Sequence, residues 1–341
     1  MKKFFCVAAV CAAAVFCCGC GEKRPVKMQS VDTAMGTVIQ QNIYTTDELS
    51  NGTKEILDLL RKLEEQELSR RIDTSEIWAV NASAGNEEGY MLSPELSETL
   101  EKCLDVWQQS QGTFDITMGP VVSLWDIDGW AAGEREGTFT LPEEELLRDA
   151  LEHCGSEKLQ MDQGRLYLPE GMMLDLGAVG KGIALDRILE YMEKNDKITG
   201  AIISVGGSVL TYGEKPEGSV WKVGIANPAK PSEGIGVLAL EGQWCISTSG
   251  DYERYVEADG VRYHHIIDPT TGYPADSGVA GVTVLSKDGF LSDALSTACF
   301  ILGPEKGTAL AAHYGAEVLF VERDGSIRMS DGMKKCFQGA K

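Results

Sequence analysis

The sequence lacks the patterns of several common kinds of site. Its cysteines beyond residue 20 are widely scattered and form no C-x-x-C pair, so neither a zinc site nor a disulfide framework is implied. It also has no Walker A loop and no G-x-G-x-x-G loop. Positive charge is scarce, because 31 lysines and arginines face 52 acidic residues, for a net charge of -21. Nucleic acid is therefore not an expected partner, and a site for any anion needs local help from a cation, backbone N–H groups or a lysine.

The first twenty residues have the pattern of an export leader. Two lysines precede an apolar run over residues 4–16, which is too short to span a membrane comfortably. Gly19 directly precedes Cys20, as at a bacterial lipoprotein cleavage site, although Cys17 stands where a Leu-like residue is usual. We expect an exported protein anchored to the bacterial cell membrane by a lipidated Cys20, with a plain cleaved signal as the alternative. The predicted parts are a signal peptide at 1–19, a lipid-anchored tether at 20–26 and one domain at 27–341.

Apolar spacing predicts a mixture of helices and strands. Helical spacing covers 47–67, and Ser93 followed by Pro94 is typical of a helix start. Residues 112–125 are expected to be a loop with an apolar stretch. Helices and strands do not alternate regularly, which favours an α+β fold with mixed, largely antiparallel sheets and flanking helices. The other predicted elements are a strand pair at 26–44, a helix at 142–154, a meander at 159–161, 165–168 and 172–174, and helices at 292–302 and 304–314.

The segment 292–297 places oxygen atoms on one side of a predicted helix. Asp293, Ser296 and Thr297 are spaced i, i+3 and i+4, so their side chains share a face. A hard cation such as Mg²⁺ prefers oxygen ligands, usually one or two carboxylates completed by phosphates and water. The same residues are also consistent with an ordinary helix start, in which they satisfy backbone groups.

A glycine-rich loop, Asp-Leu-Gly-Ala-Val-Gly-Lys-Gly, covers residues 175–182 and precedes another predicted helix. Glycines allow a ligand to approach the backbone closely, and a helix start favours an anion, which Lys181 could meet. An ordinary strand-to-helix turn is the alternative reading of this loop.

His264 and His265 are two of the four histidines in the chain. On an extended strand their side chains point to opposite faces, so at most one of them faces a given site. A histidine with a pKa near neutrality is the natural proton acceptor for a hydroxyl nucleophile. A purely structural role is the alternative for either residue.

Taken in order, these segments resemble the FAD:protein FMN transferase family, the ApbE-type flavin transferases. The resemblance spans nearly all of the chain beyond the leader, and the ordered set is far more specific than any one motif. The segments that carry it are Met35–Thr37, Ser75–Ile77 with Asn81, Gly112–Pro120, Asp175–Gly182, Val205–Gly207, Thr248–Tyr252, His264–Pro274 and Asp293–Thr297. It implies an ApbE-like flavin transferase fold, and many members are exported lipoproteins, in agreement with the leader.

The resemblance also implies residue roles. Asp293, Thr297 and the backbone carbonyl of Ala178 match ligands of Mg²⁺ or another divalent cation, and His265 matches the residue that activates the acceptor hydroxyl. Ser296 replaces a carboxylate found in some relatives, which leaves fewer charged ligands. The position of Arg71 often carries an aromatic residue that covers the flavin, and a guanidinium can stack there instead. The positions that match FAD contacts are Met35, Arg71, Thr113, Phe114, Asp115, Asp175, Lys181 and Ile267.

The implied reaction is displacement at the FMN phosphate of FAD by a serine or threonine hydroxyl of an acceptor protein, with AMP leaving. FAD is thus a substrate, and the acceptor is expected to be exported or membrane-associated. The alternatives are an FAD diphosphatase, a flavin-binding or flavin-trafficking lipoprotein, and a surface lipoprotein that binds a partner without using these residues.

Overall fold

The computed structural model of the chain describes residues 25–46 and 51–340. The predicted signal peptide, Cys20 and most of the predicted tether lie outside the described residues, so lipidation stays a prediction. Residues 47–50 at the start of the first predicted helix also lie outside. Within the described ranges, no helix is both long enough and apolar enough to cross a membrane.

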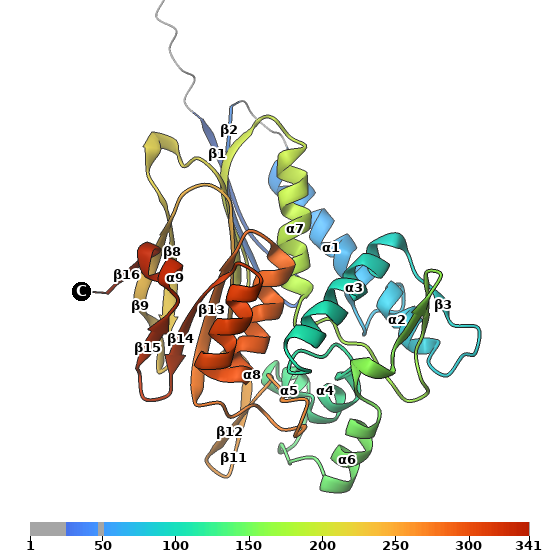
Figure 1. The fold of residues 1–341 in the computed structure, drawn as a ribbon. Coiled ribbons are helices and arrows are strands. Elements are labelled where there is room, and N and C mark those ends of the chain that lie inside the picture. Colours follow the sequence, from blue (N-terminus) through green and yellow to red (C-terminus); the bar gives the residue numbers. More distant parts are fainter. Residues whose placement is uncertain (1–24, 47–50, 341) are drawn as a thin grey trace, which may run out of the picture.

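An eight-stranded sheet lies at the centre of the fold (Figure 1). Its order is β1, β2, β6, β7, β10, β13, β14 and β15, and all neighbouring strands are antiparallel. Because side chains alternate along each strand, the two faces enter different cores, with Val282 in one and Leu285 in the other. The strands are β1 (Val26–Ala34), β2 (Thr37–Thr45), β6 (Ile198–Val205), β7 (Ser208–Gly213), β10 (Trp244–Gly250), β13 (Val279–Ser286), β14 (Glu317–Glu322) and β15 (Ile327–Met329).

A three-stranded sheet packs on one face of the central sheet. It consists of β8 (Trp221–Asn227), β9 (Lys230–Leu240) and β16 (Phe337–Gly339), with β9 in the middle. Trp221 and Val223 alternate along β8 and pack in one core with Leu285 of the central sheet. Two small sheets complete the strands: β11 (Tyr255–Ala258) with β12 (Val261–His264), and β3 (Tyr90–Met91) with β5 (Arg165–Tyr167) and β4 (Gln160–Asp162).

Two helices, α7 (Gly180–Glu193) and α8 (Gly289–His313), cover the other face of the central sheet (Figure 1). Ala294 and Ala298 of α8 pack in the same core as Val282 of β13. The remaining helices are α1 (Gly52–Leu63), continued by a π turn at Glu64–Leu68, α2 (Glu76–Ala82), α3 (Pro94–Gln109), α4 (Gly119–Trp125), α5 (Ile127–Ala131), α6 (Glu144–Glu152) and α9 (Asp331–Cys336), with short 3₁₀ turns at Ser156–Lys158 and Pro216–Gly218.

The architecture confirms the predicted α+β class. Ser93 caps α3, because its hydroxyl accepts a hydrogen bond from the Leu96 N–H at 3.1 Å. Gly303, with φ of 77°, interrupts α8 just before Pro304, where a break between two helices was expected.

Two expected elements are wrong. Residues 112–125 are not all loop, because α4 begins at Gly119, and a seven-residue helix that starts with Gly and Pro is too short to show a helical period. Residues 172–174 do not form a strand of the meander. Met173 makes only an isolated bridge with Met118, and β3 takes the third place in that sheet.

Candidate active site

A cleft lies where the start of α7, one side of α8, α4–α5 and the segment after β12 meet. It brings together most of the predicted site residues: Met35, Arg71, Thr113, Asp115, Asp175, Ala178, Lys181, His265, Ile267 and Thr297. Phe114 does not line the cleft, because its side chain is buried in the main core and supports the wall from behind. Asp293 lies just behind the lining and contacts Lys181.

Two glycines let α7 and α8 cross closely behind the cleft. A Cβ built at Gly182 would stand 2.3 Å from the carbonyl oxygen of Gly289, and one at Gly289 would stand 2.4 Å from that of Gly182. Neither position can therefore take a side chain unless a helix moves. At the crossing, the Gly182 N–H donates to Asp293 Oδ2 at 2.9 Å. The close approach thus fixes the Asp293 carboxylate beside the start of α7.

Asp293 is the buried carboxylate at this end of the cleft, with 2% of its surface exposed. Its Oδ1 lies 3.4 Å from Lys181 Nζ and accepts from the Ser208 hydroxyl at 3.4 Å. Gly180 and Lys181, the first residues of α7, line the cleft. Because a helix start carries a partial positive charge and Lys181 adds a full one, this end favours an anionic ligand.

The oxygen atoms here also suit a hard divalent cation. Thr297 lines the cleft, and its hydroxyl makes no hydrogen bond to any other described residue, so it is free to act as a ligand. The Ser296 hydroxyl is already used, because it pairs with Ser249 Oγ at 2.7 Å and donates to the Asp293 carbonyl at 2.8 Å. In the part of the chain that the structure describes, no three His, Cys, Asp or Glu side chains converge as a metal cage. A cation held by Asp293, Thr297 and the carbonyl of Ala178 would need phosphate oxygens and water, as Mg²⁺ usually does.

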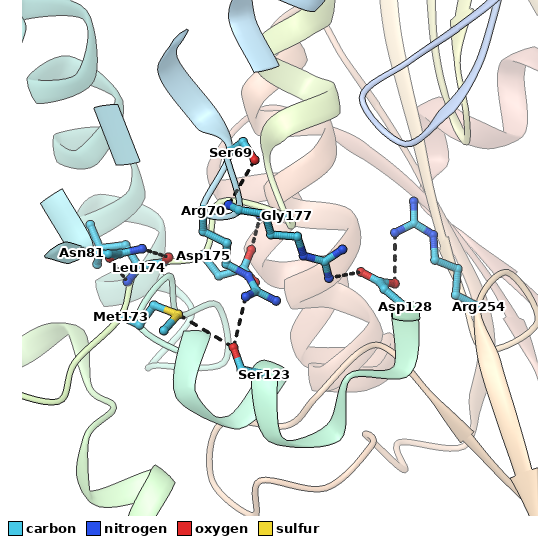
Figure 2. A network of polar contacts seen from close by, with 11 residues as sticks. Ser69, Arg70, Asn81, Ser123, Asp128, Met173, Leu174, Asp175, Gly177 and Arg254 are labelled. Atoms are coloured by element: carbon cyan, nitrogen blue, oxygen red, sulfur yellow. Dashed lines mark hydrogen bonds and ion pairs between the residues drawn. The ribbon is translucent and has the colours of Figure 1, made fainter. Parts of the chain in front are cut away.

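The glycine-rich loop is held in place by Asp175 (Figure 2). Its Oδ2 accepts from Arg70 Nε at 2.7 Å, and its Oδ1 accepts from the Gly177 N–H at 2.8 Å. Arg70 also donates to Ser123 Oγ of α4 at 3.1 Å. The carboxylate therefore ties the loop to two other parts of the cleft wall, and contact of Asp175 with FAD stays a prediction.

Met35 occupies a strained turn at the edge of the cleft. It joins β1 to β2 together with Gly36, and both residues have positive φ, 53° and 64°. Positive φ is unusual for methionine. The Met35 N–H donates to Glu64 Oε2 at 2.7 Å, which holds the turn. The protein thus maintains a costly conformation that fixes this side chain at the cleft.

The wall around Thr113 and Asp115 is held by internal hydrogen bonds. The Thr113 hydroxyl donates to the Ser110 carbonyl at 3.0 Å. Asp115 Oδ1 accepts from the hydroxyls of Thr117 at 2.6 Å and Ser156 at 2.7 Å. These two predicted FAD-contacting residues therefore shape the wall. The apolar part of the lining comes from Met118, Val122, Trp125, Ile127, Ile266, Ile267 and Ile301.

The two adjacent histidines separate as expected. His264 is buried, and its Nε2–H donates to the Ala275 carbonyl at 3.1 Å; burial lowers its pKa to about 4. His265 lines the cleft, and its Nδ1 lies 3.2 Å from the Arg254 carbonyl. A carbonyl only accepts, so Nδ1 carries the proton and Nε2 keeps a free lone pair. Burial holds the pKa of His265 below its ordinary value, so the imidazole is neutral near pH 7 and can accept a proton.

A charged network that the sequence did not reveal surrounds His265. Asp128 of α5 accepts from Arg254 Nη1 at 3.1 Å (Figure 2) and lies 3.9 Å from Arg71 Nη2. Burial alone raises the pKa of Asp128, but Arg254, His265 and Arg71 together hold it below its usual range. The Asp128 charge in turn raises the pKa of His265, against the larger effect of burial. Asp128 is therefore a permanent anion beside the candidate base.

Glu253 is a second carboxylate that the sequence did not reveal. It lines the cleft between Thr248 and Arg254, and it interacts electrostatically with Lys181 and Asp293. Its side chain has no hydrogen-bond partner among the described residues. Glu253 and Arg254 directly follow the segment 248–252 in the sequence. Extension of that segment by two residues would therefore have included both.

Comparison with known proteins covers most of the chain. A model of the ApbE family matches residues 35–320. The FAD:protein FMN transferase of Treponema pallidum is 32% identical over 335 residues, which cover 92% of this chain and 90% of that protein. The FAD:protein FMN transferase of Vibrio cholerae is 31% identical over 283 residues, which cover 82% of this chain and 80% of that protein.

Solved structures of similar proteins have the same fold. The ApbE protein of Thermotoga maritima superposes with a TM-score of 0.80 at 29% identity, over 91% of this chain and 99% of that chain. The flavin transferase ApbE from Vibrio cholerae gives a TM-score of 0.80 at 26% identity, over 92% of this chain and 99% of that chain.

Proposed function

The chain belongs to the ApbE family and is a flavin transferase, and we propose that it moves FMN from FAD to a serine or threonine hydroxyl of an acceptor protein. In this reaction the hydroxyl oxygen bonds to the phosphorus of the FMN phosphate. The bond from that phosphorus to the AMP oxygen breaks. The products are a phosphoester-linked flavin and AMP.

One observation carries the proposal: the same cleft joins an anion-favouring end to a neutral histidine. Lys181 and the start of α7 provide positive charge for a diphosphate, while His265 presents a free nitrogen. Partly exposed apolar side chains of the same lining, such as Met35 and Val122, offer a surface for a flat ring. A diphosphate joined to an aromatic ring system is the kind of ligand that fits both features.

The residues of the chain divide the chemical work. His265 Nε2 is suited to take the proton of the attacking hydroxyl, and Asp128 stabilises the imidazolium that forms. Lys181, at the positive start of α7, binds and orients the phosphates. A divalent cation at Asp293, Thr297 and Ala178 would neutralise charge on the phosphate oxygens.

We also propose that the protein works outside the cytoplasm, anchored to the membrane by lipidated Cys20. The leader over residues 1–20 supports this location. The acceptor would then be an exported or membrane-associated protein. Mass spectrometry of the N-terminus of the mature protein checks the proposal, and a start beyond Cys20 without lipid contradicts it.

Incubation of the purified protein with FAD, Mg²⁺ and candidate acceptor proteins tests the activity. Flavin fluorescence that stays on the acceptor in a denaturing gel, together with released AMP, supports transfer. Free FMN and AMP without labelled acceptor would instead make the protein an FAD diphosphatase. FAD that binds and stays intact with every acceptor would indicate a carrier.

A further inference from the structure

A second groove runs along the other side of the central sheet and is not used by the chemistry above. Its floor is the face of β2, β6 and β7 that carries the half-buried side chains of Asn42, Ser204 and Val209. Its wall is β8, whose residues Lys222, Val223, Gly224 and Ala226 line it. Three of these are consecutive, so the groove follows the main chain of β8 and not only one face of its side chains.

β8 is the edge of the three-stranded sheet. In the described part of the chain it pairs only with β9, so the N–H and C=O groups of alternate residues face away from that partner. Such an edge is a template on which another extended segment can add by main-chain hydrogen bonds. At the centre of the edge, a Cβ built at Gly224 meets no heavy atom of the described residues within 4 Å. The exposed face of β8 is therefore open at Gly224, which also lines the groove.

The groove leads to the flavin cleft. Thr248 and Glu253 line both, so the two hollows share a wall. The C-terminal end of β8 points toward this junction. Pro228, which follows β8, would stand 3.2 Å from a Cβ at Gly281, and Gly281 pairs with Gly250 just beyond Thr248. A chain lying along β8 is thus guided from Lys222 toward the shared wall.

We propose that this groove binds the acceptor protein, as an extended segment that adds to β8 as a further strand and brings its serine or threonine past Glu253 into the cleft. The inference rests on the proposed transfer reaction and adds to it the form in which the acceptor is recognised. An extended, exposed segment is a suitable acceptor because its hydroxyl must reach a phosphate that is partly enclosed. Affinity comes from the main chain, and alternate side chains contact Asn42, Ser204 and Lys222.

Gly224 offers a selective way to block the groove. Its φ lies outside the left-handed region, and the space beside it is open, so a larger side chain fits the fold and adds bulk to the β8 wall of the groove. The matched control is Ser232→Gln, which adds bulk to an exposed position of the same β8–β9 hairpin outside the groove. Neither residue belongs to the flavin cleft.

The probe is a library of synthetic peptides of about twelve residues, enough to span β8 and reach the cleft, each with one central threonine. With FAD and Mg²⁺, we expect the wild type to label a subset of them. Gly224→Gln should raise the KM for the best peptide by roughly tenfold or more, while FAD affinity and Ser232→Gln stay within about twofold of the wild type. N-methylation of the peptide backbone should abolish labelling at alternate positions only, since alternate amides face β8.

The outcomes separate this inference from the proposed function. Transfer to a folded acceptor protein without any labelled peptide would overturn strand addition and leave transfer standing. Equal labelling by the wild type and Gly224→Gln would also overturn it. If Gly224→Gln converts a dimer into a monomer in gel filtration, the groove holds a second copy of the chain and the inference is wrong. Absence of transfer to every peptide and every protein would remove the reaction itself.

Discussion

The two ends of the cleft are held by different forces. At the end beside Lys181, Asp293 is 2% exposed and lies where α7 and α8 cross with no room for a Cβ. At the histidine end, Asp128, Arg254 and Arg71 are 33%, 41% and 49% exposed and are linked by ion pairs. A change that disturbs close buried contacts between backbones lowers the stability of the fold. Loss of an exposed ion pair changes the local charge but has little effect on stability. The position of the first end is therefore set by helix packing, whereas the second end sets the charge around His265.

The largest effect is expected from Gly182→Ala. The new Cβ would meet the Gly289 carbonyl, so α7 and α8 must separate and Asp293 loses its place. We expect thermal unfolding to show a loss of roughly 3 kcal/mol, with both FAD binding and transfer abolished. Gly180→Ala in the same helix is the control for stability, because its Cβ would meet only Met35 Cε at 3.9 Å and Leu68 Cδ1 at 4.0 Å. If both variants unfold alike, the close crossing is not what holds this end.

His265→Gln should slow FMN transfer without lowering the stability of the fold. Removal of the proton acceptor is expected to slow transfer by about 10²- to 10⁴-fold, measured as FMN attached to the acceptor per minute. The neighbouring variant His264→Gln should do the reverse. It removes a buried hydrogen bond to Ala275 and should lower stability by about 1–3 kcal/mol while transfer stays within about threefold. The same loss of rate in both variants would contradict the assignment of His265 as the base.

Asp128→Asn tests the charge beside that base. A neutral imidazole is required, so the rate falls as pH drops through the pKa of His265, which burial holds below its ordinary 6.5. Asp128 raises this pKa, so its neutralisation should move the acid limb of the pH–rate profile to still lower pH. We expect the rate at pH 7 to fall by roughly tenfold, because the imidazolium loses its partner. An acid limb that moves to higher pH would exclude this role.

The smallest effect is expected from Arg71→Ala. Its guanidinium is half-exposed and lies 3.9 Å from Asp128, so loss of the pair should change stability by less than about 1 kcal/mol. If the guanidinium stacks on the flavin, the KM for FAD should rise by about threefold, and Arg71→Phe should restore it. Steady-state kinetics of the two variants decide the point: unchanged KM in Arg71→Ala would exclude stacking.

Local sequence patterns predicted the helices and strands whose residues have strong local conformational preferences. Ser93-Pro94 marked the start of α3, and the strand pair predicted at 26–44 is β1 with β2. The short α4 and the two-residue β3 were missed, because elements of this length show no period. The pairing of strands distant in sequence, such as β2 with β6, follows from packing of the whole chain and not from any local signal.

The site was predicted unevenly for a physical reason. Lys181 and Asp293 belong to short motifs whose glycine and hydroxyl neighbours constrain what they can do. Asp128 and Arg254 are 126 positions apart and look like ordinary surface charges until the fold brings them together beside His265. Sequence therefore pointed to the end of the cleft that the fold holds rigidly and, at the other end, to His265 and Arg71, but it left out Asp128 and Arg254 beside them.

Calorimetric titration of FAD, in the presence of Mg²⁺, into the wild type, Asp293→Ala and His265→Ala tests the division between the two ends most directly. The account predicts that Asp293→Ala weakens FAD binding by roughly tenfold or more, since the cation and the phosphates lose their shared carboxylate. It predicts that His265→Ala binds FAD within about threefold of the wild type, although it does not transfer FMN. Equal loss of FAD affinity in both variants would contradict it.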